Sequence, residues 1–329
     1  MPHPETVMFT EEDFEQACRA VYAAMQPTLA HPWPLLQQAT GVKTWVKHEN
    51  HTPTGAFKVR GGLNYLARLM EDGAPRPAGL ISATRGNHGQ SIPFAAARHG
   101  LPVTIVVPHG NSREKNAAMR ALGAELVEHG TIFDEAKDHA AQLAKERGLH
   151  MVPSFHEWLV AGVATYAREL FETAGELDAV YAPIGMGSGL CGLIGMRDLL
   201  GLKTDIIGVV AEGAPAYLHS WKAGTPVSAP VATFADGMAV GVPHEQAVAV
   251  INRGAARIVA VSDDEIAEAM RLLHTATHNT AEGAGAAALA ALMKERENMR
   301  GKRCAVILSG GNIDAEKYAA VLSGETPGP

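Results

Sequence analysis

Apolar positions along the chain follow two spacings, one typical of helices and one typical of buried strands. Glu11–Met25 has the 3.6-residue spacing of an amphipathic helix, and Thr10 is placed to cap its first turn. The short apolar runs 179–183, 206–211 and 304–308 are bounded by glycine or polar residues and are typical of parallel strands buried on both faces. Helices and strands alternate with short loops between them, which predicts an α/β fold with mostly parallel sheets.

The middle of the chain repeats the strand–helix unit often enough to form a sheet of its own. Strands are expected at 79–83, 103–108, 125–128 and 150–153, with helices at 89–99, 112–122 and 133–147 between them. A chain of 329 residues is longer than one hydrophobic core usually supports. We therefore expect a small mobile domain over residues 76–157, and a large domain made of residues 1–75 and 158–329.

Composition excludes several classes of protein. The hydrophobic fraction of 47% and the charged fraction of 19% are those of an ordinary globular protein. A formal net charge of −7 gives no basic footprint for nucleic acid, and no apolar run reaches the roughly 18 residues of a membrane span. Met1–Ala17 is acidic and broken by Pro2 and Pro4, so we expect no signal peptide. The three cysteines are widely spaced, which favours a reducing cytoplasm over a disulfide framework.

One lysine stands where a loop meets a helix. In Thr52-Pro-Thr-Gly-Ala-Phe-Lys58, the lysine follows a loop broken by proline and glycine and opens an apolar helix expected at 57–70. The partial positive charge of the helix N-terminus and partial desolvation both lower the pKa of such a lysine, as imine chemistry requires. Most lysines are solvated surface residues, so this motif gains weight only together with others.

A second loop is rich in glycine. Ile184-Gly-Met-Gly-Ser-Gly-Leu190 follows the strand at 179–183 and precedes a helix, an arrangement that favours a bound phosphate. The run Gly187–Gly192 also matches GxGxxG, and Glu212 lies about 20 residues beyond it, as in a dinucleotide-binding fold. A tight turn without a ligand is the third interpretation. The loop alone does not decide among them.

Two further loops carry polar groups. Ser82-Ala-Thr-Arg-Gly-Asn-His-Gly-Gln90 lies between a strand and a helix and is dense in hydrogen-bond donors, which suits a carboxylate or a ring oxygen. Leu308-Ser-Gly-Gly-Asn312 follows the last strand, at a carboxyl end of the kind where open α/β sheets bind ligands. Each loop alone is compatible with an ordinary turn.

In this order, the four segments resemble those of the fold-type II pyridoxal-phosphate (PLP) enzymes, which include the serine/threonine dehydratases and serine racemase. The resemblance covers roughly Ala30–Leu322. It implies a two-lobed, tryptophan synthase β-like fold with PLP as cofactor, and it favours PLP over a dinucleotide.

The resemblance gives a role to each matching residue. It implies that Lys58 carries the cofactor as a Schiff base, with Phe57 beside the ring. It also implies that Asn87 hydrogen-bonds the ring hydroxyl and that Ser309 bonds the pyridine nitrogen. The residues of the implied phosphate cradle are Gly185, Met186, Gly187, Ser188 and Gly189, with Met186 in place of a common glycine. The residues implied on the substrate side are Ser82, Thr84, Arg85, His88 and Glu282.

The reaction that this resemblance implies is a β-elimination. The amine of Lys58 removes the α-proton of an amino acid, the cofactor takes up the electrons, and loss of the β-hydroxyl leads to a 2-keto acid and ammonia. The expected substrates are L-serine, L-threonine or a bulkier analogue such as phenylserine or hydroxyaspartate. Racemisation and β-replacement on the same scaffold stay open as alternatives. An NAD-binding oxidoreductase is a more distant alternative, and a non-enzymatic metabolite sensor is another.

Two positions depart from the family pattern. Arg85 stands where the racemase has a proton-exchanging serine, and arginine cannot exchange protons near neutrality, which disfavours racemisation by that route. Arg85 then either reads a substrate feature, assists the leaving hydroxyl or forms a surface salt bridge. Glu212 and Ala216 fit a family cation site, but Leu218 replaces its aspartate, so we assign no metal and leave a monovalent cation open. We also expect a homodimer, and no regulatory domain after Ser309.

Overall fold

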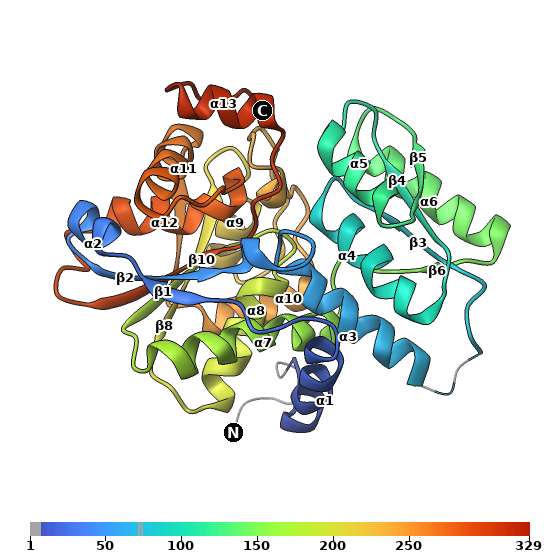
Figure 1. The fold of residues 1–329 in the computed structure, drawn as a ribbon, viewed down its shortest axis with the longest axis horizontal. Helices are drawn as coiled ribbons and strands as arrows, with labels where there is room; N and C mark the ends of the chain where they lie inside the picture. Colours follow the sequence, from blue (N-terminus) through green and yellow to red (C-terminus); the bar gives the residue numbers. More distant parts are fainter. Residues whose placement is uncertain (1–7, 72, 74) are drawn as a thin grey trace.

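Two sheets organise the computed structural model, which describes residues 8–71, 73 and 75–329 (Figure 1). The six-stranded sheet has the order β1-β2-β10-β7-β8-β9, and the four-stranded sheet has the order β5-β4-β3-β6. This confirms the α/β fold with mostly parallel sheets. Residues 1–7, part of the segment expected not to be a signal peptide, lie outside the described residues, as do Asp72 and Ala74.

The larger sheet is parallel except at one edge. Its strands are β1 (Ala30–Pro32), β2 (Lys43–His48), β10 (Arg303–Leu308), β7 (Ala179–Pro183), β8 (Asp205–Ala211) and β9 (Arg257–Val261). β1 pairs antiparallel with β2, and the other neighbours are parallel. The three strands expected from apolar runs occupy the middle of this sheet, where both faces are covered. β1 contains no such run, whereas β9 contains one at 258–261 that was not predicted.

Helices cover both faces of the larger sheet (Figure 1). Alternate strand residues enter opposite cores, with Val180 on one side and Tyr181 on the other. The helices on the Val180 side are α1 (Glu11–Tyr22), α7 (Glu157–Ala174), α8 (Ser188–Leu199) and α10 (Glu245–Gly254). Those on the Tyr181 side are α2 (Pro34–Thr40), α11 (Asp263–Thr277) and α12 (Gly283–Glu295). Two further helices are α9 (Ala216–Ala223) and α13 (Ala315–Leu322). Thr10 caps α1, as expected.

The smaller sheet is parallel throughout. Its strands are β3 (Leu80–Ala83), β4 (Val103–Val107), β5 (Glu125–Glu128) and β6 (His150–Met151), with helices α4 (Asn87–Ala96), α5 (Arg113–Ala121) and α6 (Phe133–Arg147). All of these lie within residues 76–157. Short 3-10 segments occur at η2 (Glu49–His51), η3 (Ala97–His99) and η4 (Asp236–Met238). The boundaries and mobility of a separate small domain stay a prediction.

Helix α3 (Lys58–Glu71) lies between the two sheets (Figure 1). Its residues Val59 and Leu66 share a core with Leu80 and Ile92 of the smaller sheet and its helix. The same helix packs against α7 of the larger sheet. The residue that begins α3 is therefore held by both sheets at once. Within the described part of the chain, none of the helices is long and apolar enough to cross a membrane.

Candidate active site

Lys58 occupies the first position of α3 and is half-buried. Its Nζ donates a hydrogen bond to Ser188 Oγ at 3.1 Å and lies 4.8 Å from the centre of the Phe57 ring. Burial lowers the pKa of Lys58 to about 8, and no described carboxylate pairs with the amine. A lysine in this state loses its proton far more readily than a surface lysine, which suits an amine that attacks a carbonyl carbon.

The glycine loop lies directly before α8, and its glycines are required by close contacts. A Cβ on Gly185 would lie 2.3 Å from the carbonyl oxygen of Gly237, and Gly187 has a left-handed backbone with φ of 101°. Gly187 is the N-cap of α8, and no side chain caps this helix. The first N–H groups of a helix have no partner within the helix, so they face outward as donors for an anion. Ser188 brings its hydroxyl to the same place.

Tyr166 of α7 supports this loop, and no sequence motif predicted this role. Its hydroxyl donates to the carbonyl oxygen of Gly189 at 2.8 Å, and its ring meets Phe57 edge-on at 6.0 Å between centroids. The carbonyl of Met186 is held in turn by the hydroxyl of Tyr217 at 2.8 Å. The loop is thereby fixed from two helices.

The loop after β10 joins the loop that carries Lys58. Phe57 N donates to the carbonyl oxygen of Ser309 at 3.0 Å, and Ala56 forms an isolated bridge with Gly310. Ser309 is buried, and within the described residues its hydroxyl has no hydrogen-bond partner. A Cβ on Gly310 would come within 2.5 Å of Glu282 Oε1 and 3.3 Å of Asn87 Nδ2. Glycine at this position therefore lets three loops converge.

Asn87 makes two contacts that join the sheets. Its Nδ2 donates to Glu282 Oε1 at 2.5 Å, and its Oδ1 accepts a hydrogen bond from Asn312 Nδ2 at 2.8 Å. Asn312 also donates to the carbonyl oxygen of Thr54, ahead of Lys58, at 2.8 Å. The loop containing Asn312 was predicted from the sequence to bind a ligand, but no role was predicted for Asn312 itself.

The remaining residues of the loop after β3 differ in where they point. The hydroxyl of Ser82 donates to the carbonyl oxygen of Val152 at 3.0 Å, inside the smaller sheet, so its geometry gives no support to a substrate role. Thr84 is buried and accepts a hydrogen bond from Gly86 N at 3.1 Å. Burial and the nearby Lys58 lower the pKa of His88 to about 3, and its buried Nε2 has no partner in the described residues.

Arg85 is exposed and faces a cavity of about 420 Å³ at the edge of the site. Glu282 and Lys115 line the same cavity. Arg85 forms no ion pair or hydrogen bond with a described residue, so no surface salt bridge of the kind considered from the sequence is seen among those residues. Its guanidinium is available to a ligand that enters the cavity.

Glu212 lies away from these loops and is paired. Lys294 Nζ of α12 lies 3.2 Å from Glu212 Oε1, and the same ammonium contacts Glu265 and the carbonyl oxygen of Ala260. An ammonium thus contacts the carboxylate that both the cation and the dinucleotide interpretations require. Within the described part of the chain, no group of three or more His, Cys, Asp or Glu residues is arranged to hold a metal ion. The absence of a metal stays a prediction.

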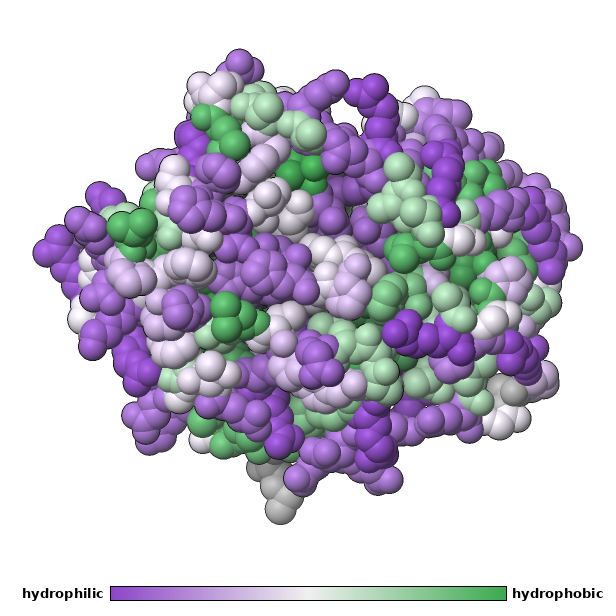
Figure 2. Space-filling model, viewed as in Figure 1, coloured by the Kyte–Doolittle hydropathy of each residue, from purple (hydrophilic) through white to green (hydrophobic). Residues whose placement is uncertain are grey.

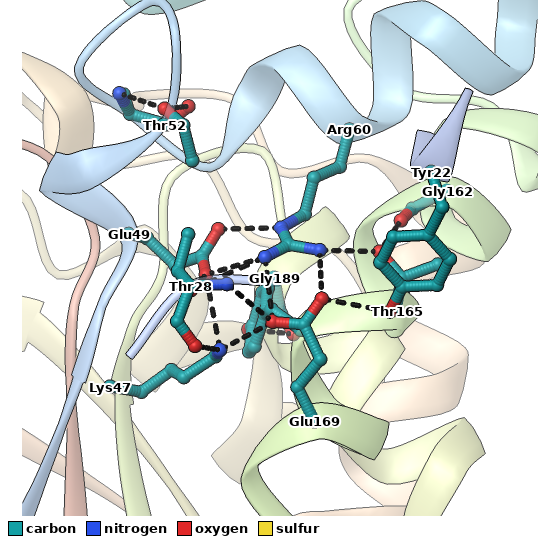
Figure 3. A network of polar contacts seen from close by, with 12 residues as sticks. Tyr22, Thr28, Lys47, Glu49, Thr52, Arg60, Gly162, Thr165, Glu169 and Gly189 are labelled. Atoms are coloured by element: carbon teal, nitrogen blue, oxygen red, sulfur yellow. Dashed lines mark hydrogen bonds and ion pairs between the residues drawn. The ribbon is translucent and has the colours of Figure 1, made fainter. Parts of the chain in front are cut away.

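A buried ionic network anchors the first turn of α3 (Figure 3). Arg60 is fully buried and lies 2.7 Å from Glu49 and 2.6 Å from Glu169. Lys47 lies 2.5 Å from Glu169, so the network holds two cations and two carboxylates. Burial raises the pKa of Glu169, but Arg60 and Lys47 outweigh it and hold that pKa below its usual value. The network fixes the helix two residues after Lys58.

The chain matches the model of the family described as "Pyridoxal-phosphate dependent enzyme" over residues 21–310. It belongs to this family. PLP, predicted from the four loops, is therefore confirmed as the cofactor.

Named relatives and solved structures agree with this assignment. The L-threo-3-hydroxyaspartate ammonia-lyase of Pseudomonas sp is 35% identical over 291 residues, which cover 88% of this chain and 91% of that protein. The L-threonine ammonia-lyase of Thermotoga maritima is 32% identical over 318 residues, covering 96% and 79%. The structure of the processed form of threonine deaminase isoform 2 from Solanum lycopersicum matches with a TM-score of 0.86 at 29% identity, covering 96% of this chain and 95% of that chain.

The residues in place fit PLP. An amine without a carboxylate partner, a glycine loop at an uncapped helix start and the unpartnered hydroxyl of Ser309 are each matched to one part of the cofactor. Lys58 would hold the aldehyde carbon, Gly185–Gly189 the phosphate, and Ser309 the pyridine nitrogen.

Proposed function

We propose that the protein is a PLP-dependent ammonia-lyase that converts a β-hydroxy L-amino acid to a 2-keto acid and ammonia. The observation that carries the proposal is the amine of Lys58, with its pKa lowered to about 8, held 3.1 Å from the hydroxyl of the glycine loop. This chain covers 79% and 91% of the length of two relatives that are named as ammonia-lyases, which supports the same type of reaction here.

Each residue has a defined task in this proposal. Bound PLP supplies an acceptor for the electrons left at Cα when the α-proton is removed. Lys58 holds the cofactor, and its released amine takes the α-proton. The hydroxyl of Ser309 is a neutral partner for the pyridine nitrogen, which leaves the ring less electron-withdrawing than a carboxylate would and favours elimination over transamination. Phe57, whose ring centre lies 4.8 Å from Lys58 Nζ, would lie beside the cofactor ring and limit its movement.

The substrate is proposed to enter from the cavity. The loop from Thr84 to His88 would hold the α-carboxylate through its N–H groups, and His88 is uncharged there because its pKa is lowered to about 3. Arg85 would read a polar or anionic group on the β-carbon, since no described residue occupies its guanidinium. Glu282 lies at the N-cap of α12, next to Asn87.

The test is a product assay on the purified holoenzyme. L-serine, L-threonine, L-threo-3-hydroxyaspartate and phenylserine are supplied in turn, and keto acid, ammonia and the D-enantiomer are measured. The proposal predicts keto acid and ammonia in equal amounts from at least one substrate, and no product from Lys58→Ala. Accumulation of the D-enantiomer without ammonia would replace this function by racemisation.

A homodimer in the cytoplasm, with a small domain that moves over the cavity, is part of the same proposal. These features are supported by the family resemblance, by the three dispersed cysteines and by the cavity residues that come from both sheets. Light scattering on the eluted holoenzyme tests the dimer, and hydrogen exchange over residues 76–157 with and without substrate tests the movement.

A further inference from the structure

A second lysine lies in the site, and its surroundings are opposite to those of Lys58. Lys115 belongs to the first turn of α5, a helix that packs beside the smaller sheet. Its side chain is only 5% exposed. Its Nζ lies 3.2 Å from Glu282 Oε2 and 3.4 Å from Asp236 Oδ2, and both of these residues belong to the larger lobe. Burial opposes its charge, but Glu282 and Asp236 raise the pKa of Lys115 above the usual value.

The two lysines therefore differ in their state of charge. Lys58, which has no carboxylate partner among the described residues, has a lowered pKa, whereas Lys115 remains an ammonium ion. An ammonium cannot act as a base, so the role of Lys115 concerns the groups that it contacts.

Glu282 uses both of its oxygens. Oε1 accepts from Asn87, and Oε2 pairs with Lys115. Glu282 is itself 5% exposed, and a carboxylate this buried is strongly destabilised without a paired cation. Lys115 supplies that cation from the other lobe.

The path of the Lys115 side chain depends on Gly86. A Cβ on Gly86 would lie 3.3 Å from Lys115 Cδ and 3.5 Å from its Nζ, so the lysine runs directly beside the loop between Arg85 and Asn87. Asp236 begins η4, and the carbonyl of the next residue, Gly237, is the atom that excludes a side chain at Gly185. The ammonium thus lies beside the loop that carries Asn87 and contacts Glu282. It also contacts Asp236, whose neighbour Gly237 packs against the glycine loop.

Hydrogen bonds between the start of α5 and the start of α13 hold α5 against the larger lobe. Asp314 Oδ1 accepts from Ser112 Oγ at 2.6 Å and from Glu114 N at 3.2 Å, while Ala315 N donates to Glu114 Oε1 at 2.7 Å. Figure 1 shows the start of α13 beside α5, and the face drawn in Figure 2 is largely hydrophilic in that region. Arg113 and Glu316 add an exposed ion pair at 3.1 Å across the same contact.

We propose that Lys115 is a positioning residue, whose ammonium fixes the carboxylate of Glu282 against Asn87 only when α5 is docked on the larger lobe. This inference rests on the proposed function and deepens it, because it makes the placement of Glu282 in the site depend on closure of the two lobes. Asp236, which directly precedes the residue that packs against Gly185, shares the ammonium.

The test compares three variants as holoenzymes. Lys115→Met removes the charge and Lys115→Arg keeps it. Arg120→Met is the control, because it breaks an exposed ion pair that the same helix forms with Glu128 outside the cavity. The measurements are kcat and KM against pH, cofactor affinity by absorbance titration, and Tm. The charged or titratable side chains that face Glu282 or line its cavity are Lys115, Asp236, Arg85, His109, Arg113, Asp314 and Lys317.

For Lys115→Met we expect kcat/KM to fall about 100-fold, carried mainly by kcat. Without the ammonium, the low-pH limb of the profile should move to higher pH, because the positive charge beside a buried carboxylate has been removed. Lys115→Arg keeps that charge and should bring the limb back toward its wild-type position. Arg120→Met should keep the wild-type profile.

Two results would overturn the inference. One is a Lys115→Met profile that superimposes on the wild type with kcat/KM within twofold, and the other is an equal loss in Arg120→Met. If Lys115→Met fails to fold, Lys115→Gln carries the same comparison. A wild-type holoenzyme that makes no keto acid contradicts the proposed function instead, so the two failures are distinguishable.

Discussion

The side-chain amide of Asn312 donates to the side-chain oxygen of Asn87 at 2.8 Å, which links the loop after β10 to the loop after β3. These loops belong to different sheets. Because Asn312 also holds the carbonyl of Thr54 near Lys58, one side chain sets the spacing between the amine and the proposed partner of the ring hydroxyl. The site is therefore largely formed by the protein itself, and the cofactor meets partners that are already in position.

The lowered pKa of Lys58 predicts how cofactor loading depends on pH. Only the unprotonated amine attacks the aldehyde of PLP, so the rate of loading onto apoprotein should rise as the pH passes through about 8 and level off above it. Stopped-flow absorbance of imine formation measures this rate. A rate that continues to climb toward pH 10.5 would show an ordinary solvated lysine.

The buried network under α3 predicts a large loss of stability when one charge is removed. Arg60→Met leaves two buried carboxylates, Glu49 and Glu169, with Lys47 as the one remaining cation of that network, and we expect the free energy of unfolding to fall by about 3–5 kcal/mol. Urea unfolding at fixed cofactor concentration measures it. Arg168→Met, which breaks only exposed pairs with Glu15 and Glu172, is the matched control and should cost about 0–1 kcal/mol. Equal effects of the two variants would contradict the account.

The unpaired guanidinium of Arg85 predicts a change in substrate preference. Arg85→Ala should lower kcat/KM by about 10- to 100-fold for the β-substituted substrate that the enzyme prefers, the value of a hydrogen bond to a charged group. The effect on L-serine should be much smaller. A set of kcat/KM values over four β-hydroxy amino acids checks this. Uniform values close to wild type would remove Arg85 from substrate recognition.

The contact between Lys294 and Glu212 predicts that divalent ions have little influence on activity. Because an ammonium already balances this carboxylate, treatment with EDTA should change kcat by less than about twofold. Lys294→Gln is the companion variant, in which Glu212 becomes available to an added ion. A large loss on chelation of the wild type, restored by Mg²⁺ or Ca²⁺, would show that the contact does not replace a metal.

Much of the fold could be predicted from the sequence because its strongest patterns involve residues that are close together in the chain. The strands at 179–183 and 304–308 were readable as apolar runs that need cover on both faces. β1 is a three-residue edge strand with one buried residue, which leaves no run to recognise. Likewise, the glycine loop before α8 could be predicted as a candidate anion site because a strand end and a helix start are adjacent in sequence there.

The missed site residues depend on contacts between distant segments. Lys115 lies in a polar helix, and nothing near it in the sequence shows that it is buried against Asp236, 121 residues later. Tyr166 and Asn312 reach the site from a buried helix and a turn. Ser82 shows the converse case, since a hydroxyl that was expected at the substrate donates to the carbonyl oxygen of Val152, and its substrate role stays a prediction.

The most direct measurement is reduction of the yellow holoenzyme with borohydride, followed by mass spectrometry of its peptides. Reduction fixes the cofactor to the amine that holds it. The account predicts a single pyridoxyl-modified peptide, the one that contains Lys58, and no modification in Lys58→Ala. Modification of another lysine, such as Lys115, or of none at all, would contradict it.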